Sequence, residues 1–432
     1  MSLGLLQMPK RIVFVPLLVA LMAAACTAIL RPPQPYGMRL PSTAVLGPEF
    51  SVFDQAAGIV TTAVDGNDRV HLLIAASGSS DLYHAVIGPA GSEELETVVN
   101  PAPSSPIVAA FDSDGDLHAV FGPEYFVLHD KVWSQRAKSL PCERLLYAGK
   151  TLICAYLAHD LKTGARWRID YFSTPLSLGI PIPVPVRSRM LLLACWSSSD
   201  WVTWAQLDPA ENRDVADYQV SGDDSGSVQV LYIWRRQIIA TASGVDIARA
   251  PGMTDCGART PENPIVEFSG KAMINNGGIN SDLYDFAIAV DPHTGDSLSI
   301  AGAMELHTLQ SFMRRGDSID SPRPVEPDRR GLSTIHGPIR IAPAGRDRFH
   351  VLLNVRTTFH NDIVLFYMTY FNGEWSPPIE ISRSTITSWS EANVKLISVG
   401  SRRALAVWPE DHQIRARWIE AAPSSGPEDL RE

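Results

Sequence analysis

The stretch Ala63–Ala75 reads AVDGNDRVHLLIA, and Ala110–Gly122 repeats its pattern as AFDSDGDLHAVFG. Asp65 lies six positions before His71, and the second segment keeps the same spacing. In each segment an apolar strand, a polar Asp/Gly turn and a second apolar strand follow one another, which is the pattern of a β-hairpin. Because one such hairpin cannot bury its apolar faces alone, its recurrence predicts stacked supersecondary units.

Weaker copies of this pattern occur further along the chain, at Ala289–Gly302 (AVDPHTGDSLSIAG) and Ile341–Leu353 (IAPAGRDRFHVLL). Candidate units, each with several short apolar strands, begin near Gly58, Pro106, Arg144, Arg189, Val228, Phe286, Ile339 and Val394. The segment Ser221–Asn280 is irregular, so eight units are the literal count and seven are the alternative.

The short strands, separated by Gly, Pro, Asn and Asp turns and without a long amphipathic helix, indicate an all-β protein. Four-stranded units repeated around an axis predict a β-propeller of seven or eight four-stranded blades, which leaves few exposed edges. The last unit supplies three strands, and Pro48–Asp54 (PEFSVFD) is expected to add the fourth and close the ring. A pair of β-sandwich domains is the alternative architecture.

The first residues form a predicted export signal. Lys10 and Arg11 form a short basic region. The apolar segment that follows, Ile12–Ala25, is shorter than a typical transmembrane helix. The sequence Ala-Ala-Ala-Cys ending at Cys26 resembles a bacterial lipobox, which implies lipidation of Cys26. An ordinary secretory signal is the alternative. In similar lipoproteins the residue after the cysteine influences sorting, and Thr27 favours the outer membrane.

These observations divide the chain into four parts. Residues 1–25 are the predicted signal peptide, and residues 26–44 are a lipidated cysteine with a proline-rich tether. Residues 45–420 are the predicted propeller, and residues 421–432 are a predicted disordered tail. The chain is therefore expected in the cell envelope, held to the membrane by its lipid.

The charge of the chain argues against a nucleic-acid partner. Its formal net charge is −10, with 47 acidic and 37 basic residues, and the basic residues are scattered. Nucleic-acid binding depends on a concentrated basic face that displaces counterions. The expected partner is therefore an envelope protein or a glycan.

Four cysteines follow the predicted lipidation site: Cys142, Cys154, Cys195 and Cys256. An even number in an oxidising envelope is compatible with two disulfides. Cys142 and Cys154 flank a predicted hairpin, and Cys195 with Cys256 would be the remaining pair. Buried free thiols are the alternative for this second pair.

Three histidines occupy equivalent positions at the start of second strands: His71, His118 and His350. In a propeller they could converge on a channel metal, but packing within each blade is the simpler interpretation. Four tryptophans lie close in sequence and are candidates for stacking on a sugar or peptide: Trp196, Trp201, Trp204 and Trp234. Packing between sheets is the simpler interpretation for them too.

Two propeller classes resemble parts of the chain. The Asp-turn-His units and Gly373–Ser376 (GEWS) are similar to repeats of sialidase-like exported propellers. Sialidases also carry an arginine-bearing strand motif, and Arg340–Pro343 (RIAP) resembles it weakly. The Asp-boxes of sialidases are missing, which counts against glycosidase activity. Ala289–Gly295 resembles the A-x-D-x-x-T-G turn of quinoprotein-type repeats.

No nucleophile elbow, zinc-protease motif, P-loop or dinucleotide fingerprint is present, so we assign no catalytic residue and no cofactor. The sequence favours an envelope-anchored β-propeller lipoprotein that acts as a non-catalytic binding or scaffold module. The alternative is a sialidase-like glycan hydrolase or lyase. That alternative requires several arginines or paired carboxylates at one mouth of the channel.

Overall fold

The protein is described here by a computed structural model. It covers residues 44–98, 107–112, 114–129, 132–138, 140–159, 166–173, 179–186, 189–197, 200–207, 213–236, 243–250, 256, 265–271, 285–303, 308–321, 323–325, 333–335, 339–345, 347–357, 363–384, 394–400, 402–410 and 412–421. The predicted signal peptide, Cys26, most of the tether and residues 422–432 of the predicted tail lie outside these residues. Within them every regular element is a β-strand. Membrane-spanning helices are not found among them.

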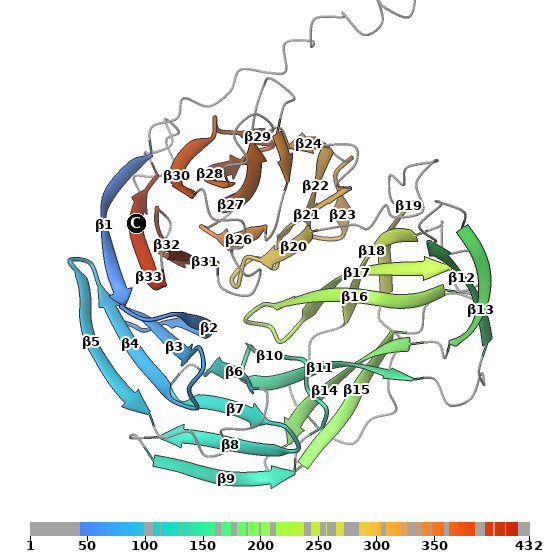
Figure 1. Ribbon diagram of the computed structural model, residues 1–432, viewed down its shortest axis with the longest axis horizontal. Helices are drawn as coiled ribbons and strands as arrows, with labels where there is room; N and C mark the ends of the chain where they lie inside the picture. The colour runs from blue at the N-terminus through green and yellow to red at the C-terminus, as the bar shows by residue number, and fades with distance from the viewer. Residues whose placement is uncertain are drawn as a thin grey trace, which may run out of the picture. The chain divides into compact units, whose positions relative to one another are not determined.

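Seven antiparallel sheets, or blades, are arranged in a ring (Figure 1). Blade 1 contains β2 (Ala57–Val64), β3 (Val70–Ala76), β4 (Leu82–Gly88) and β5 (Gly91–Val98). Blade 2 contains β6 (Ile107–Phe111), β7 (Leu117–Phe121), β8 (Glu124–His129) and β9 (Val132–Lys138). Blade 3 contains β10 (Arg144–Ala148), β11 (Thr151–His159), β14 (Arg189–Ser197) and β15 (Asp200–Leu207). Blade 4 contains β16 (Arg213–Gly222), β17 (Val228–Arg236), β18 (Ser243–Ala250) and β19 (Ile265–Lys271).

The remaining blades are less regular at their edges. Blade 5 contains β20 (Asp285–Val290), β21 (Ser297–Ala303) and β22 (Thr308–Arg315), with an outer edge made of β23 (Ser318–Ile319) and β24 (Arg323–Val325). Blade 6 places β25 (Ser333–Ile335) and β26 (Arg340–Pro343) beside β27 (Arg348–Thr357), followed by β28 (Ile363–Phe371), β29 (Glu374–Trp375) and β30 (Ile379–Ser384). Blade 7 contains β31 (Lys395–Val399), β32 (Arg403–Glu410), β33 (Gln413–Glu420) and β1 (Val45–Phe53). The predicted β-propeller is confirmed, with seven blades.

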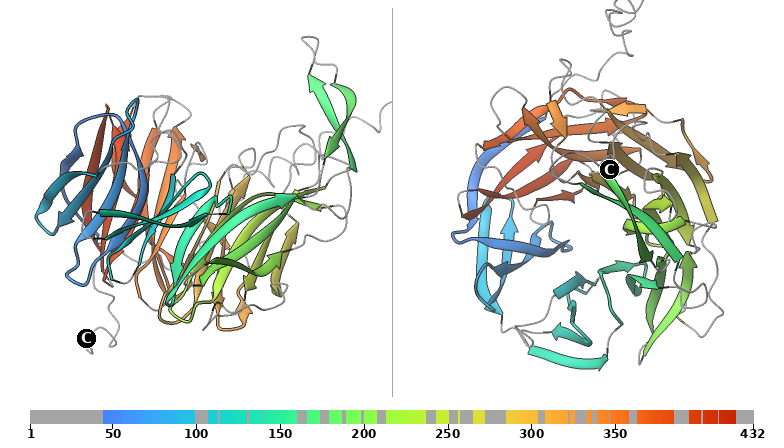
Figure 2. Two further views of the ribbon diagram at one scale, coloured as in Figure 1. Left: turned by 90° about the horizontal axis from the view of Figure 1, so that it is seen from below. Right: turned by 45° about the vertical axis from the view of Figure 1, so that its right-hand side comes forward.

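The literal count of eight units is corrected because two predicted units form one blade. β11 pairs with β14, although the hairpin β12 (Arg166–Ser173) and β13 (Gly179–Val186) lies between them in sequence. Figure 2 shows this hairpin outside the ring of sheets. Its second strand repeats proline at Pro181, Pro183 and Pro185, which donate no backbone hydrogen bonds and therefore suit an edge strand. A second correction concerns Val228, which begins the second strand of blade 4 rather than the first.

The core consists of apolar layers between neighbouring blades. Each of the seven adjacent pairs has its own buried cluster, including the pair formed by blades 7 and 1. Leu72 and Leu73 on β3 illustrate how both faces of a sheet are covered. They are adjacent in sequence, and both are fully buried. Their side chains point to opposite faces of the sheet, and each face packs on a different neighbouring blade. Every sheet therefore depends on two others.

The repeated Asp of the sequence pattern builds the turn between the first and second strands. The Oδ1 atom of Asp65 accepts hydrogen bonds from the backbone N–H groups of Asn67 (2.8 Å) and Arg69 (3.0 Å). Asp112 and Asp223 accept the equivalent pair of backbone hydrogen bonds in blades 2 and 4, and Asp291 in blade 5 accepts from the N–H groups two and three positions ahead of it. A carboxylate that binds the N–H groups ahead of it fixes the reversal of the chain. The sequence repeat is therefore a repeat of this turn.

The first strand, β1, closes the ring by pairing with β33 as the fourth strand of blade 7, as the sequence predicts. The Glu49 carboxylate lies 3.1 Å from Arg415 Nη1 and 3.3 Å from Arg417 Nη2, both on β33. Arg417 also donates a hydrogen bond to the Ile381 carbonyl on blade 6 (2.7 Å). Glu49 thus holds the two ends of the propeller together through two partly buried cations.

The four cysteines form two disulfides, Cys142–Cys154 and Cys195–Cys256. The first joins the residues at the start of blade 3 to β11 of the same sheet. The second joins β14 of blade 3 to the connection between β18 and β19 of blade 4. Because it closes a separation of 61 residues, it is expected to stabilise the junction of these blades by about 4 kcal/mol through loss of unfolded-state entropy.

We predict that Glu49→Ala destabilises the fold by about 1–3 kcal/mol, because it leaves two partly buried guanidinium groups without their carboxylate. The matched control is Glu380→Ala, which removes an exposed carboxylate paired with Arg383 and is expected to cost less than about 0.5 kcal/mol. Thermal unfolding followed by circular dichroism compares the two variants. Equal losses of stability in the two variants would contradict the role of Glu49 in closing the ring of blades.

A second prediction concerns Asp65. Burial raises the pKa of its carboxyl, but hydrogen bonds from Arg69, Asn67 and His71 outweigh this effect and hold the pKa well below its usual value. A lowered folded pKa gives stability above the unfolded value of about 4, and this stability is lost as pH falls toward the folded pKa. Asp65→Asn should therefore cost about 1 kcal/mol at neutral pH, with a cost that shrinks below pH ~4. Asp68→Asn, in the same turn but exposed, is the control in urea unfolding at each pH.

Candidate functional site

A cavity of about 740 Å³ lies where the innermost strands of the seven blades begin. Those strands contact one another in the order β2, β6, β10, β16, β20, β26 and β31, and β31 contacts β2 again. The lining residues come from all seven blades: Gly58–Val60, Ala75, Ile107–Ala109, Glu143–Leu145, Asp217, Gln219, Phe286–Ile288, Ile339–Ile341 and Lys395. The cavity is thus the mouth of the central channel, and its size suits a small ligand or one end of a longer one.

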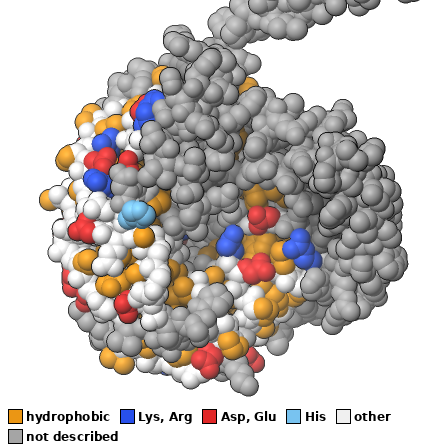
Figure 3. All heavy atoms as spheres, viewed as in Figure 1, with side chains coloured by type: hydrophobic (Ala, Val, Ile, Leu, Met, Phe, Trp, Pro, Cys, Tyr) orange, Lys and Arg blue, Asp and Glu red, His pale blue; other side chains and the backbone are white. Residues whose placement is uncertain are grey.

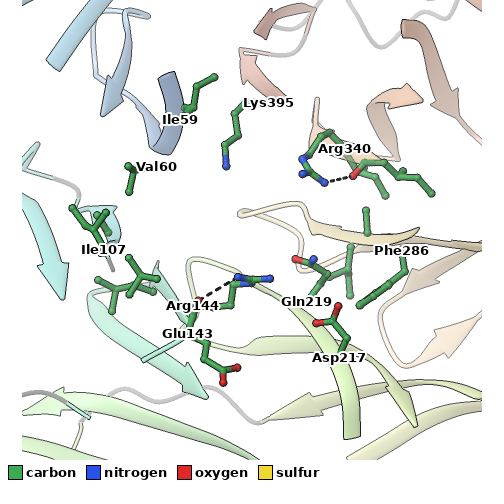
Figure 4. A pocket seen from close by; sticks show the side chains of 18 of the residues that line it. Ile59, Val60, Ile107, Glu143, Arg144, Asp217, Gln219, Phe286, Arg340 and Lys395 are labelled. Atoms are coloured by element: carbon green, nitrogen blue, oxygen red, sulfur yellow. Dashed lines mark hydrogen bonds between the residues drawn. The ribbon is translucent and has the colours of Figure 1, made fainter. Parts of the chain in front are cut away.

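Three cationic side chains meet in this mouth. Arg144, Arg340 and Lys395 are the first residues of β10, β26 and β31, and their nitrogen atoms extend into the opening (Figure 4). Arg340 is fixed by two backbone carbonyls, because its Nε donates to Val394 (2.8 Å) and its Nη1 donates to Ile339 (2.8 Å). The side chain is therefore held beside the root of Lys395 on the neighbouring blade.

Lys395 is held in an environment that disfavours its charge. Burial, followed by repulsion from Arg340 and Arg144, lowers the pKa of its ammonium to about 8. Among the residues that the structure describes, no side chain forms an ion pair or a hydrogen bond with it. A cation placed beside two others without a carboxylate partner is unfavourable for the fold, and such an arrangement is typical of a site that receives an anion.

Two carboxylates line the same mouth as the three cations. Glu143 precedes β10 and Asp217 lies on β16. The Tyr218 hydroxyl lies 3.0 Å from Glu143 Oε2 and 2.9 Å from the Ala155 carbonyl, and the backbone N–H of Tyr218 donates to Asp217 Oδ1 (2.7 Å). Burial and the nearby Glu143 raise the pKa of Tyr218, whose side chain is only 2% exposed. Tyr218 therefore positions the two carboxylates and is a poor nucleophile.

Apolar side chains complete the cavity wall. Ile59, Val60 and Ile107 come from blades 1 and 2, and Phe286 comes from blade 5. Figure 3 shows acidic and basic side chains among apolar ones at the opening. The mouth thus combines a cationic cluster, hydrogen-bond acceptors and apolar surface, which together can orient a polar ligand.

The three histidines proposed as channel metal ligands do not line this cavity. Each pairs with a ring on the next strand of its own blade: His71 Nδ1 lies 2.9 Å from His84 Nε2, His118 Nδ1 lies 2.7 Å from the Tyr125 hydroxyl, and His350 Nδ1 lies 2.5 Å from the Tyr367 hydroxyl. Burial lowers the pKa of His350 to about 3, so it is neutral. Within the described parts of the chain no three His, Cys, Asp or Glu side chains are placed to hold a metal ion.

The four tryptophans proposed for ligand contact lie between sheets. Trp204 and Trp234 are each 3% exposed in the layer between blades 3 and 4. Trp201 is buried between blades 2 and 3, where the Trp196 ring packs against it at 5.5 Å. None of the four lines the channel mouth. We assign them a packing role.

The cations of the mouth were largely missed by the sequence analysis, which noted only Arg340 through its strand motif. A signal was available, because a basic residue begins the innermost strand of four blades, and three of these four residues line the mouth. This signal is seen only when the first residues of the innermost strands are aligned from blade to blade. The hairpin β12–β13 inserted in blade 3 and the misplaced start of blade 4 obscure that alignment in the sequence.

No protein-family model matches the chain, and no curated protein sequence is similar to it. Solved structures are similar at low identity. A protein of unknown function from Dyadobacter fermentans has a TM-score of 0.43 and 10% identity, over 89% of this chain and 100% of its own. An α-L-arabinanase of Penicillium chrysogenum, solved with arabinobiose, has a TM-score of 0.39 and 10% identity, over 87% and 98%. A gluconolactonase of Xanthomonas campestris has a TM-score of 0.37 and 11% identity, over 90% and 99%.

We predict that Lys395→Met raises the thermal midpoint at pH 7, because it removes a buried charge repelled by two arginines. A lowered folded pKa means that the unfolded chain binds more protons between pH ~8 and ~10.5, so wild-type stability rises with pH across this window. The advantage of the variant should therefore shrink toward pH ~10. Differential scanning fluorimetry at several pH values measures it, with Lys150→Met at an exposed position as control. An unchanged or lower thermal midpoint would contradict the claim that the charge of Lys395 destabilises the fold.

Proposed function

We propose that this protein is a non-catalytic binding module of the cell envelope and that the mouth of its central channel binds an acidic glycan. The observation that supports this proposal is the convergence of Arg144, Arg340 and Lys395 on one cavity. A carboxylate or sulfate between these side chains would neutralise their repulsion and accept charge-assisted hydrogen bonds from the guanidinium groups.

The rest of the cavity wall supports a carbohydrate rather than a purely apolar ligand. Glu143, Asp217 and Gln219 offer oxygen atoms that can accept hydrogen bonds from ligand hydroxyls. Val60, Ile107 and Ile341, which are partly exposed, offer apolar surface against which the C–H face of a sugar ring can pack. Because the cavity lies at the mouth of a channel, a terminal residue of a glycan chain can enter it.

A glycan hydrolase or lyase is the second candidate function, and one observation favours it. Two arginines, Arg144 and Arg340, and two carboxylates, Glu143 and Asp217, line this one mouth of the channel. Glu143 and Asp217 would then serve as acid and base around a bound sugar. A product assay on the same acidic oligosaccharides separates the candidates, because a binding module leaves them intact while Glu143→Gln abolishes turnover by a hydrolase.

We predict that acidic oligosaccharides bind and that neutral ones of the same length do not. Arg340→Gln should weaken binding at least about tenfold, because one charge-assisted hydrogen bond to an anion contributes about 1.5–3 kcal/mol. Arg136→Gln on the exposed outer strand of blade 2 should leave affinity unchanged. Isothermal titration calorimetry measures both variants. Equal binding of neutral and acidic ligands would contradict the role of the cations.

The pH dependence of this binding has a defined sign. Lys395 is the titrating group, and it faces Arg340 and Arg144, with Glu143 and Asp217 lining the same mouth. An anion binds the protonated ammonium more tightly, so affinity should fall as pH rises from ~7 through ~9. In Lys395→Met this pH dependence should disappear.

The envelope location of the protein is part of the same proposal. The resemblance of the segment before Cys26 to a lipobox supports lipidation, and the proline-rich tether supports separation of the propeller from the membrane. We predict that Cys26→Ser transfers the protein from the membrane fraction to the soluble fraction. Fractionation with immunoblotting measures this, and continued membrane association of the variant would contradict lipid anchoring.

A further inference from the structure

We propose that the amine of Lys395 forms a reversible covalent imine with carbonyl-bearing acids, such as 2-oxo acids or aldehydic sugar acids, that enter the channel mouth. This inference rests on the proposed function, because it uses the same cationic cavity to hold the acid group. It identifies a class of ligand that the site would retain by a covalent bond as well as by charge.

The first observation that supports the proposal is the position of the Lys395 side chain. Its side chain extends from the start of β31 into a cavity of about 740 Å³ that is open to solvent (Figure 4). Among the described residues no carboxylate or carbonyl engages its nitrogen, so the nitrogen is available to a ligand. Arg315, by contrast, has two acidic partners, Asp320 and Asp347.

The neighbours of Lys395 favour the neutral amine, which is the nucleophilic form. Burial and the two guanidinium groups lower the pKa of Lys395 to about 8. A neighbouring cation activates a lysine in this way because it makes protonation of the amine unfavourable. The neutral fraction near pH 7.4 is then about a hundredfold or more above that of an ordinary lysine.

The arginines would also orient the reacting carbonyl. A carboxylate bound by Arg340 places an adjacent carbonyl carbon near the root of the same cluster, because Arg340 is fixed to Val394 and Lys395 follows directly in sequence. Such orientation raises the effective concentration of the two reacting groups.

The reaction conserves atoms and needs no further reagent. The lone pair of the Lys395 nitrogen forms a bond to the carbonyl carbon, and the carbonyl π electrons move to oxygen. The nitrogen loses its two protons to that oxygen by way of solvent, the carbon–oxygen bond breaks, and one water leaves as the carbon–nitrogen double bond forms. Hydrolysis reverses the sequence and releases the ligand.

The experiment incubates the purified propeller with pyruvate and sodium cyanoborohydride, which reduces an imine to a stable secondary amine. Peptide mapping by mass spectrometry then measures the rate of modification at Lys395 and at the exposed Lys150 in the same sample. We expect Lys395 to react at least about tenfold faster than Lys150 at pH 7.4. Acetone, which lacks the carboxylate, should show a much smaller preference for Lys395.

Two variants test this inference. Lys395→Arg removes the nucleophilic amine, so the pyruvate adduct on the intact protein should fall to the level that exposed lysines such as Lys150 contribute. Arg340→Gln should lower the rate for pyruvate more than the rate for acetone, because both reactions lose the effect of Arg340 on the pKa of Lys395 but only pyruvate also loses the partner of its carboxylate. Modification of Lys395 no faster than Lys150 overturns the imine, even if acidic glycans bind. Fast modification without glycan binding supports the reactive amine and overturns the glycan proposal.

Discussion

The burial of both faces of every sheet is the constraint on which this structure depends. A four-stranded antiparallel sheet with apolar side chains on both faces is unstable alone, since each face must be removed from water. Arranging seven such sheets around an axis gives each one two neighbours. The seven buried clusters correspond one to one with the seven junctions. Loss of any junction exposes two apolar faces, which explains why a strand from each end of the chain shares the last blade.

The same arrangement creates the candidate site. The innermost strand of every blade contributes residues to the channel mouth, and the first residues of β10, β26 and β31 place their charges there. Apolar residues of the mouth, such as Ile59 and Ile339, also pack between blades, whereas Arg144, Arg340 and Lys395 belong to none of the buried clusters. The rigid strands hold Arg144, Arg340 and Lys395 close together despite their mutual repulsion. Stability gained between the blades thus supports an arrangement of charges that would not persist on a flexible loop.

The histidines and tryptophans show why residue type alone did not locate the site. His71 and His118 were correctly placed at equivalent positions of their blades, but these positions are on second strands. A second strand has a strand on each side, so its side chains contact rings within or between blades rather than the axis. The tryptophans Trp204 and Trp234 fill the layer between blades 3 and 4, where large rings bury the most apolar area.

The sequence by itself determined the all-β class, the hairpin with its Asp turn, the four-stranded unit and the closure by the first strand. These features depend on local periodicity, turn chemistry and the missing strand of the last unit, all of which can be read along the chain. The number of blades and the cationic mouth were decided by tertiary structure. Strand pairing across the β12–β13 hairpin merged two predicted units, and the ring brought together residues from blades 3, 6 and 7. The physical reason is that hydrogen bonds and charges act through space, where residues distant in sequence become neighbours.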